Sequence, residues 1–189
     1  MNRALATALA TALLSGAVFT ASDAAQSSLE INACELLTPA EISAAVGLPV
    51  DKGRRQDEGI SRDGQYSSTC FWTIEPGKAP DQSAPGRGRR FVILNAHRWP
   101  AGQGMAKKFL DAFQESADQG VIANQPVPRK FGDDALWWGD GLAVRKGDVS
   151  FGISVFMPKR GEARTSAMEE KLAPHILKRL DRMDRKSAV

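Results

Sequence analysis

The chain holds two cysteines, Cys34 and Cys70, and they follow an N-terminal segment with the features of a secretory signal peptide. Met1-Asn2-Arg3 is a short basic start, residues 4–21 are apolar and rich in alanine, and Ser22-Asp23-Ala24 offers small residues for cleavage. Because an exported protein meets an oxidising environment, the two cysteines are expected to pair and to close a loop of about 37 residues. Such a disulfide would stabilise the fold by about 4 kcal/mol.

Residues 1–24 are therefore predicted to be a signal peptide, and residues 25–189 a single periplasmic or secreted domain. The remaining chain is long enough for one hydrophobic core and short for two. We expect no transmembrane segment in it, because no second apolar run of spanning length follows. A lipid anchor is not expected either, since Cys34 lies well beyond the apolar segment.

The net charge of the chain is +3, and its pI is about 9.0. This mild basicity suits a protein near anionic envelope surfaces. It falls short of the clustered charge that nucleic-acid binding requires, so no nucleic-acid partner is expected.

Three helices are predicted. Thr38, Pro39 and Glu41 form a capping box that starts a helix over residues 39–46, and Gly47 ends it. Helical spacing of apolar residues predicts a second helix over 103–118 and a third over 165–183, where Ser166 and Glu169 are spaced as another capping box. Pro174 should either kink the third helix or begin it, and residues 184–189 are expected to fray.

The strands follow from alternation and from apolar runs. Residues 69–74 place Cys70, Trp72 and Ile74 on one face, and the apolar run 91–97 is typical of a central strand that is covered on both faces. Residues 131–138, 142–145 and 149–155 predict an antiparallel meander. Residues 76–90, rich in proline and glycine, are expected to form a flexible loop. The predicted fold class is α+β, with an antiparallel sheet of five or six strands packed by N-terminal, middle and C-terminal helices.

Four short motifs carry a family resemblance. They are Cys34 to Glu41 with Gly47, then Cys70-Phe71-Trp72, then Phe131 to Ala135, then Val144 to Asp148. With them the chain resembles a family of uncharacterised small exported domains, many of which are lipoproteins of actinobacteria. The resemblance implies a disulfide between the two motif cysteines and a compact α+β domain, and it implies no activity. The chain differs from many of those proteins because it lacks their lipid-attachment cysteine.

No catalytic residue, metal site or cofactor is predicted. His97 and His175 have no partner at metal-ligand spacing, and no nucleophile elbow, phosphate loop or dinucleotide fingerprint is present. Four aspartates gather around the meander turns, where Asp and Gly are favoured for backbone reasons, although their oxygens could also bind calcium. They are Asp133, Asp134, Asp140 and Asp148.

The candidate binding surface combines arginine and tryptophan, the residue types that anchor interfaces. Its residues are Arg87, Arg89, Arg90, Arg98, Trp99 and Trp138. The alternative is that the tryptophans fill both sides of a covered sheet and that the arginines only solubilise a loop. The leading hypothesis is a non-enzymatic binding module that contacts an envelope component or a partner protein. The second hypothesis is an inhibitor or immunity-type protein that blocks a hydrolase or toxin with residues 76–90. The third and least favoured hypothesis is a hydrolase that uses the aspartates.

Overall fold

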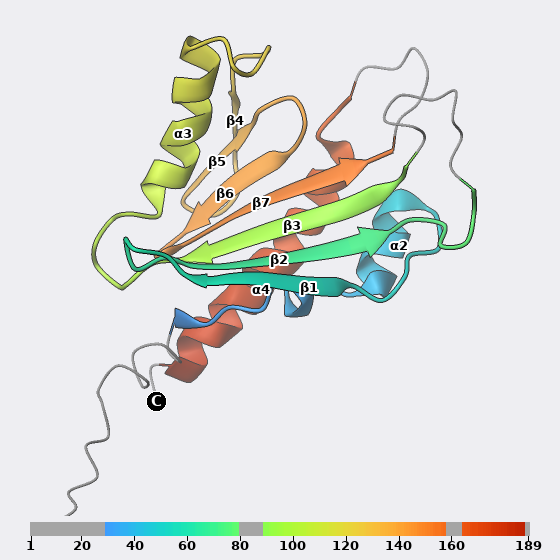
Figure 1. Ribbon diagram of the computed structural model, residues 1–189, viewed down its shortest axis with the longest axis horizontal. Helices are drawn as coiled ribbons and strands as arrows, with labels where there is room; N and C mark the ends of the chain where they lie inside the picture. Colours follow the sequence, from blue (N-terminus) through green and yellow to red (C-terminus); the bar gives the residue numbers. More distant parts are fainter. Residues whose placement is uncertain (1–28, 80–88, 158–163, 188–189) are drawn as a thin grey trace, which may run out of the picture.

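A seven-stranded antiparallel sheet organises the part of the chain that the computed structural model describes, which is residues 29–79, 89–157 and 164–187 (Figure 1). The strand order is β1-β2-β3-β7-β6-β5-β4. The elements, in chain order, are the 3₁₀ turn η1 (Ala33–Glu35), α2 (Pro39–Val46), β1 (Arg54–Ile60), β2 (Tyr66–Thr73), β3 (Phe91–Arg98), α3 (Lys107–Asp118), β4 (Val127–Arg129), β5 (Asp134–Trp137), β6 (Leu142–Lys146), β7 (Val149–Phe156) and α4 (Ala167–Ser187).

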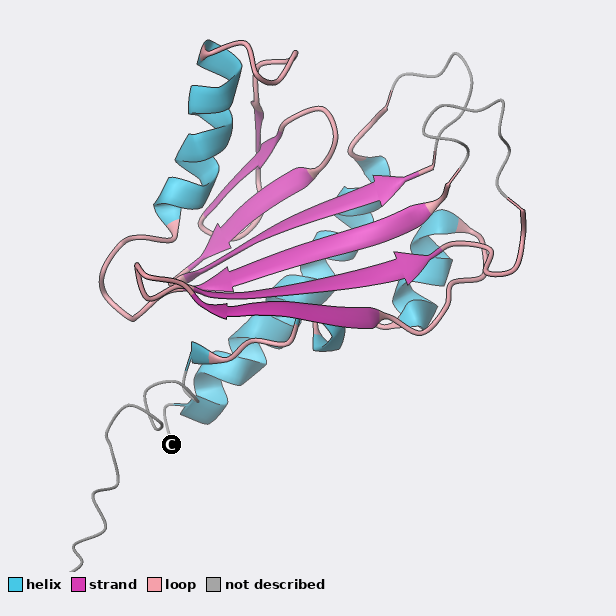
Figure 2. Ribbon diagram, in the orientation of Figure 1, coloured by secondary structure: helices cyan, strands magenta, loops and turns pink. Residues whose placement is uncertain are grey.

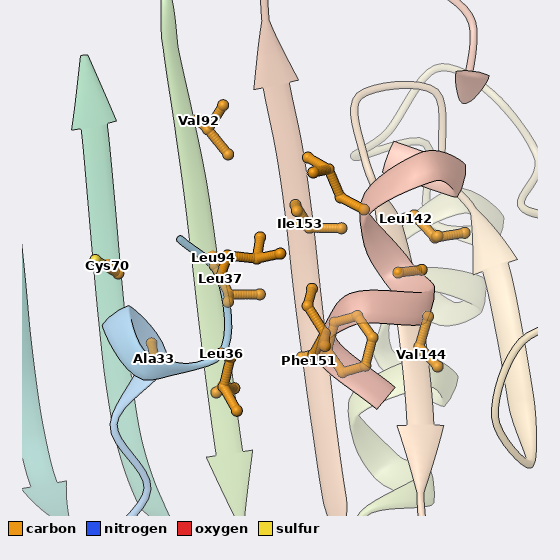
Figure 3. Close-up of a cluster of buried hydrophobic side chains, with 14 of the residues drawn as sticks. Ala33, Leu36, Leu37, Cys70, Val92, Leu94, Leu142, Val144, Phe151 and Ile153 are labelled. Atoms are coloured by element: carbon orange, nitrogen blue, oxygen red, sulfur yellow. The ribbon is translucent and has the colours of Figure 1, made fainter. Parts of the chain in front are cut away.

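The two faces of the sheet are covered differently. On one face, η1 contacts β2 and β3, and α4 contacts β6 and β7, with α2 packed on α4. Apolar side chains of the strands alternate toward these helices and form the hydrophobic core (Figure 3). On the opposite face, α3 contacts β6 and β7. Among the described residues, no helix combines the length and apolar composition that a membrane crossing requires.

The predicted disulfide is present and joins η1 to β2. The Cα atoms of Cys34 and Cys70 lie 5.0 Å apart. Beside it, the backbone N–H of Ala33 donates a buried hydrogen bond of 3.0 Å to the Ser68 hydroxyl. The N-terminal part of the described chain is therefore fixed to the core face of the sheet at two neighbouring points.

The first helix is confirmed with its predicted ends. The Thr38 hydroxyl accepts the Glu41 N–H, the Glu41 carboxylate accepts the Thr38 N–H, and Gly47 ends the helix at φ +73°. Glu41 also binds α4: its carboxylate lies 2.9 Å from the Arg179 guanidinium and 3.0 Å from Nδ1 of His175. One side chain thus starts α2 and ties it to the C-terminal helix.

The Glu41 contacts predict a loss of stability in acid. Partial burial pushes the pKa of Glu41 up, but hydrogen bonds from Arg179 and Thr38 outweigh this effect and hold the pKa at about 2 instead of 4.5. A lowered folded-state pKa adds stability that is complete above pH 4.5 and is lost as the pH falls toward 2. We expect Glu41→Gln to remove about 2 kcal/mol from the free energy of unfolding at pH 6, allowing for solvent screening, and almost nothing at pH 2.

Urea denaturation at both pH values measures this difference. The control is Glu115→Gln, an exposed position on α3, which should leave the free energy of unfolding unchanged at both. Equal losses for Glu41→Gln at pH 6 and pH 2 would contradict the electrostatic explanation.

The strand count is the main correction to the predicted fold: the sheet has seven strands, not five or six. The predicted meander is present as β5, β6 and β7, paired antiparallel. The strands that the sequence did not indicate are β1 and β4, which form the two edges. Six of the seven residues of β1 are exposed, and β4 has three residues including Pro128, so neither carries an apolar alternation.

Both edges carry features that weaken further strand pairing. The register of β1 against β2 shifts at a bulge between Asp57 and Gly59. At the other edge, Pro128 lies within β4 and offers no backbone N–H.

The later helices differ from the prediction at their ends. The middle helix begins at Lys107 rather than at residue 103, and α4 runs from Ala167 to Ser187 with Pro174 inside it. Pro174 therefore does not begin the helix, and residues 184–187 belong to the helix instead of fraying. The expected pairing of Ser166 with Glu169 is also wrong, because the Glu169 carboxylate is instead bonded to the Val155 N–H and to Arg164.

Candidate functional site

The outer face of the sheet over β2 and β3 carries aromatic side chains that are partly exposed. The sequence predicts that both faces of the strand at 91–97 are covered, and on the outer face this is wrong for the first part of the strand. Val92, Leu94 and Ala96 are fully buried in the core, whereas Phe91 and Ile93 on the opposite face are partly exposed. No described helix crosses the Phe91 end of this part of the sheet, which faces the viewer in Figure 2, because α3 lies over β6, β7 and the His97 end of β3.

Three phenylalanines from neighbouring strands stack along this surface. The ring centroids of Phe71 and Phe91 lie 4.9 Å apart, and those of Phe91 and Phe156 lie 5.1 Å apart, with interplanar angles of 25° and 21°. We call the three stacked rings, together with Ile93 and Thr69, the ladder face. All five residues are partly exposed.

An arginine covers each end of the stack. The guanidinium of Arg54 lies 5.5 Å from the ring centroid of Phe71, and that of Arg164 lies 5.9 Å from the ring centroid of Phe156. The flat faces of the rings are thus occupied by neighbouring rings or by guanidinium groups. What remains exposed is a ridge of ring edges with a cation at each end, and this differs from the bare aromatic platform on which a sugar ring stacks.

A hollow of about 610 Å³ opens near the Arg164 end of the stack. Its lining residues are Asn124, Gln125, Val127, Trp137, Gly139, Asp140 and Arg164. The volume lies within the range of small-ligand sites in proteins. The hollow combines apolar walls with amide groups and one ion pair.

Arg164 is held beside this hollow because β7 is longer than β6. The pairing of the two strands ends at Leu142 and Ile153, so the backbone groups of Val155 have no strand partner on that side. The Val155 N–H donates to Glu169, and its carbonyl accepts a bond of 3.0 Å from Arg164. Burial raises the pKa of Glu169, although bonds from Val155 and Arg164 partly offset this.

The two carboxylates that bind Arg164 differ in their exposure. The side chain of Glu169 is 2 % exposed and lies 3.1 Å from the guanidinium. That of Asp140 is 78 % exposed and lies 3.0 Å from it. Exposed ion pairs contribute only about 0–1 kcal/mol, so the Asp140 contact is easily replaced while the Glu169 contact is fixed.

The structure separates most of the residues of the predicted binding surface. Arg90 pairs with Glu75 at the start of β3 near the stacked rings, whereas Arg98 at its other end, about 27 Å away, pairs with Asp184. Trp99 is only 5 % exposed. Trp138 stacks on Phe113 of α3 with ring centroids 4.5 Å apart. Arg89 is exposed, and Arg87 lies outside the described residues.

Sequence reasoning missed the residues of the ladder face. A signal for one of them was present, since Phe71 lies between Cys70 and Trp72 and must point away from the core. The same alternation places Phe91 opposite Val92. The sequence did not show that α3 leaves this part of the face without a covering helix.

The four aspartates of the turns are all bonded to nearby donors. Asp133 accepts the Gly147 N–H at 2.7 Å, and Asp134 accepts two N–H groups of Arg145. Asp140 binds Arg164, and Asp148 accepts the Gly102 N–H at 3.4 Å. These contacts join the aspartates to residues distant in sequence, so each carboxylate links two segments of the fold.

The two histidines also have neighbouring partners. His97 lies beneath α3 with Nδ1 3.0 Å from the Ser67 hydroxyl, and burial lowers its pKa, so the ring is neutral at pH 7. His175 contacts Glu41 between α2 and α4. Within the described ranges, no three His, Cys, Asp or Glu side chains are placed together as metal ligands.

Comparisons with known proteins find no family model, no curated protein and no solved structure that matches the chain. The function proposed below therefore rests on the chemistry of the ladder face.

Proposed function

We propose that the protein is a non-enzymatic binding module, exported to the periplasm or the cell exterior, which contacts a partner protein or an envelope component through the ladder face. The observation that carries this proposal is the partly exposed stack of Phe71, Phe91 and Phe156 on a part of the sheet face that no described helix covers.

The chemistry of this surface favours association. Aromatic residues and arginine are enriched at protein interfaces, and here three rings stack across neighbouring strands with a guanidinium group at each end. The rings are already ordered by stacking on one another, so binding would immobilise few additional side chains. A rigid apolar ridge with cations at its ends suits a partner that offers apolar side chains flanked by negative charge.

The side chains that could act as catalytic acids or bases already have hydrogen-bond partners, and this also favours binding over catalysis. The carboxylates of Asp133 and Asp148 accept backbone N–H groups of distant residues, that of Asp134 pairs with Arg145, and His97 is neutral and covered by α3. Catalytic acids and bases are usually found in a cleft where substrate can reach them. The surface that stands open is instead apolar and cationic.

Replacing the central ring tests the proposal. We expect Phe91→Thr to reduce the capture of a partner from envelope extract at least tenfold, because the substitution removes the ring that contacts both neighbours. Threonine suits a strand, so the fold should persist. The measurement is quantitative mass spectrometry of material that the immobilised protein retains, and circular dichroism verifies the folding of each variant.

The matched control is Val121→Thr. Val121 is 73 % exposed but lies in the turn after α3, away from the ladder face. This variant should capture as much as the unchanged protein. Equal capture by the folded Phe91→Thr variant would refute a role for the ladder face in binding.

A further inference from the structure

We propose that the hollow beside Arg164 binds a carboxylate group carried on an apolar body, and that Asp140 occupies the position of this carboxylate in the unliganded protein. Arg164 also ends the ring stack of the ladder face, but the proposed site opens into the hollow beside it, and its test uses no partner protein.

The first argument is the unused hydrogen-bonding capacity of Arg164. A guanidinium carries five N–H donors. The described residues take three of them: two on Nη2, which bind the Val155 carbonyl and Glu169, and one on Nη1, which binds Asp140. The Nε donor and the second Nη1 donor make no hydrogen bond with a described residue. These two donors lie on a side chain that lines the hollow.

The second argument is the difference between the partners of Arg164. The Val155 carbonyl and the buried Glu169 orient the guanidinium, and neither depends on a ligand. Asp140 is 78 % exposed and reaches the same guanidinium from the rim. An incoming carboxylate can therefore take the place of Asp140 without disturbing the groups that orient Arg164.

The lining residues identify the rest of the ligand. Trp137 and Val127 provide apolar surface, and Val127 is 47 % exposed in the unliganded protein. Asn124 and Gln125 add amide groups that can bind polar atoms at the edge of an apolar body. The apolar body of such a ligand would thus bury Val127, while the carboxylate of the ligand binds Arg164.

The charge of the site favours a carboxylate over a phosphate. Among the described residues that line the hollow, Arg164 is the sole cation, and Glu169 already lies against it. A ligand carboxylate that displaces Asp140 leaves two carboxylates at the guanidinium, as in the unliganded protein. A phosphate dianion would add a second negative charge close to Glu169 and Asp140 without a second cation to balance it.

Benzoate is the probe, and benzamide is its uncharged control. Binding is followed by NMR through the indole N–H of Trp137 and the Nε–H of Arg164. We expect benzoate to shift both signals saturably, with benzamide at least tenfold weaker. Asp140→Asn should bind benzoate about fivefold more tightly than the unchanged protein, because the competing carboxylate is removed. Arg164→Gln should abolish binding.

The control for Asp140→Asn is Asp118→Asn, an exposed position on α3, which should leave the dissociation constant of benzoate unchanged. Arg164→Gln also leaves the buried carboxylate of Glu169 without its cation, which by itself can destabilise the fold. Asp140→Asn avoids this problem because Asp140 is exposed. Its benzoate affinity therefore tests the proposal whether or not the Arg164→Gln variant folds. Unchanged or weaker benzoate binding by Asp140→Asn, or equal binding of benzamide, would overturn the proposal.

A second pair of probes distinguishes two kinds of ligand that could supply the carboxylate, a peptide C-terminus and a free organic acid. The peptide acetyl-Ala-Ala-Leu with a free C-terminal carboxylate is compared with its C-terminal amide. Tighter binding of the acid peptide than of benzoate indicates that the site takes the C-terminal residue of a peptide. Tighter binding of benzoate indicates a free organic acid, and either result supports a carboxylate site if the amide peptide fails to bind.

Discussion

Removal of the Cys34–Cys70 disulfide is expected to lower the free energy of unfolding by about 4 kcal/mol. The bridge spans 36 positions of sequence, so without it the unfolded chain gains the conformational freedom of a long open loop. A loss of this size is a large share of the 5–15 kcal/mol that holds a typical domain folded. The test is urea denaturation of the oxidised protein and of the Cys34→Ala/Cys70→Ala double variant.

Dithiothreitol provides the matched control for this experiment. It should destabilise the unchanged protein about as much as the double substitution does, and it should have no effect on the double variant. A loss below about 1 kcal/mol in the double variant would show that the contacts of η1 with β2, such as the Ala33 to Ser68 hydrogen bond, hold the fold without the cross-link.

Gly132→Ala is expected to cost about 3 kcal/mol of stability. Gly132 has a φ of +58°, and a Cβ atom at this position would lie 2.3 Å from the carbonyl oxygen of Arg145. That oxygen also accepts the Asp133 N–H at 2.8 Å, so it cannot move away without breaking the junction between the loop and β6. Alanine therefore suffers an unfavourable backbone conformation and a backbone clash together.

Gly147→Ala separates these two effects. Gly147 has a nearly identical φ of +56°, but a Cβ atom there would meet nothing within 4 Å. This variant should lose only about 1 kcal/mol, the cost of the left-handed conformation. Thermal and urea unfolding of both variants measure the difference. Equal losses of unfolding free energy in the two variants would mean that the Arg145 carbonyl moves to accommodate the Cβ atom. The clash would then not be the reason that position 132 requires glycine.

The elements that the sequence predicted well are those with local determinants. The limits of α2 follow from Thr38, Glu41 and Gly47, which act within one or two turns of helix. The meander was predictable because β7 alternates cleanly, with Val149, Phe151, Ile153 and Val155 all buried. The disulfide could be predicted because the sequence has only two cysteines and is expected to be exported to an oxidising compartment.

The elements that were missed depend on distant partners. The strand β1 is formed by pairing with β2, and its residues, such as Arg54 and Gln56, carry no apolar pattern of their own. The start of α3 was placed too early because its N-terminus has no side-chain cap to mark it.

The candidate site was harder to predict than the fold. The position of Phe71 on the outer face could be deduced from strand alternation. Its stacking on Phe91, and that of Phe91 on Phe156, needed the pairing of β2 with β3 and of β3 with β7. The role of Arg164 was hidden as well, because it depends on how far β7 extends past β6. The sequence suggested tryptophans as binding residues, yet Trp99 is buried.

The two edges of the sheet limit how copies of this protein can associate. With a bulge in β1 and Pro128 in β4, neither edge offers the straight row of free amides that templates fibrils or open-ended stacking of subunits. Edge-to-edge pairing of copies at high local concentration is therefore disfavoured. A specific complex is expected to be made mainly by side chains, whose identity mutation can change one position at a time.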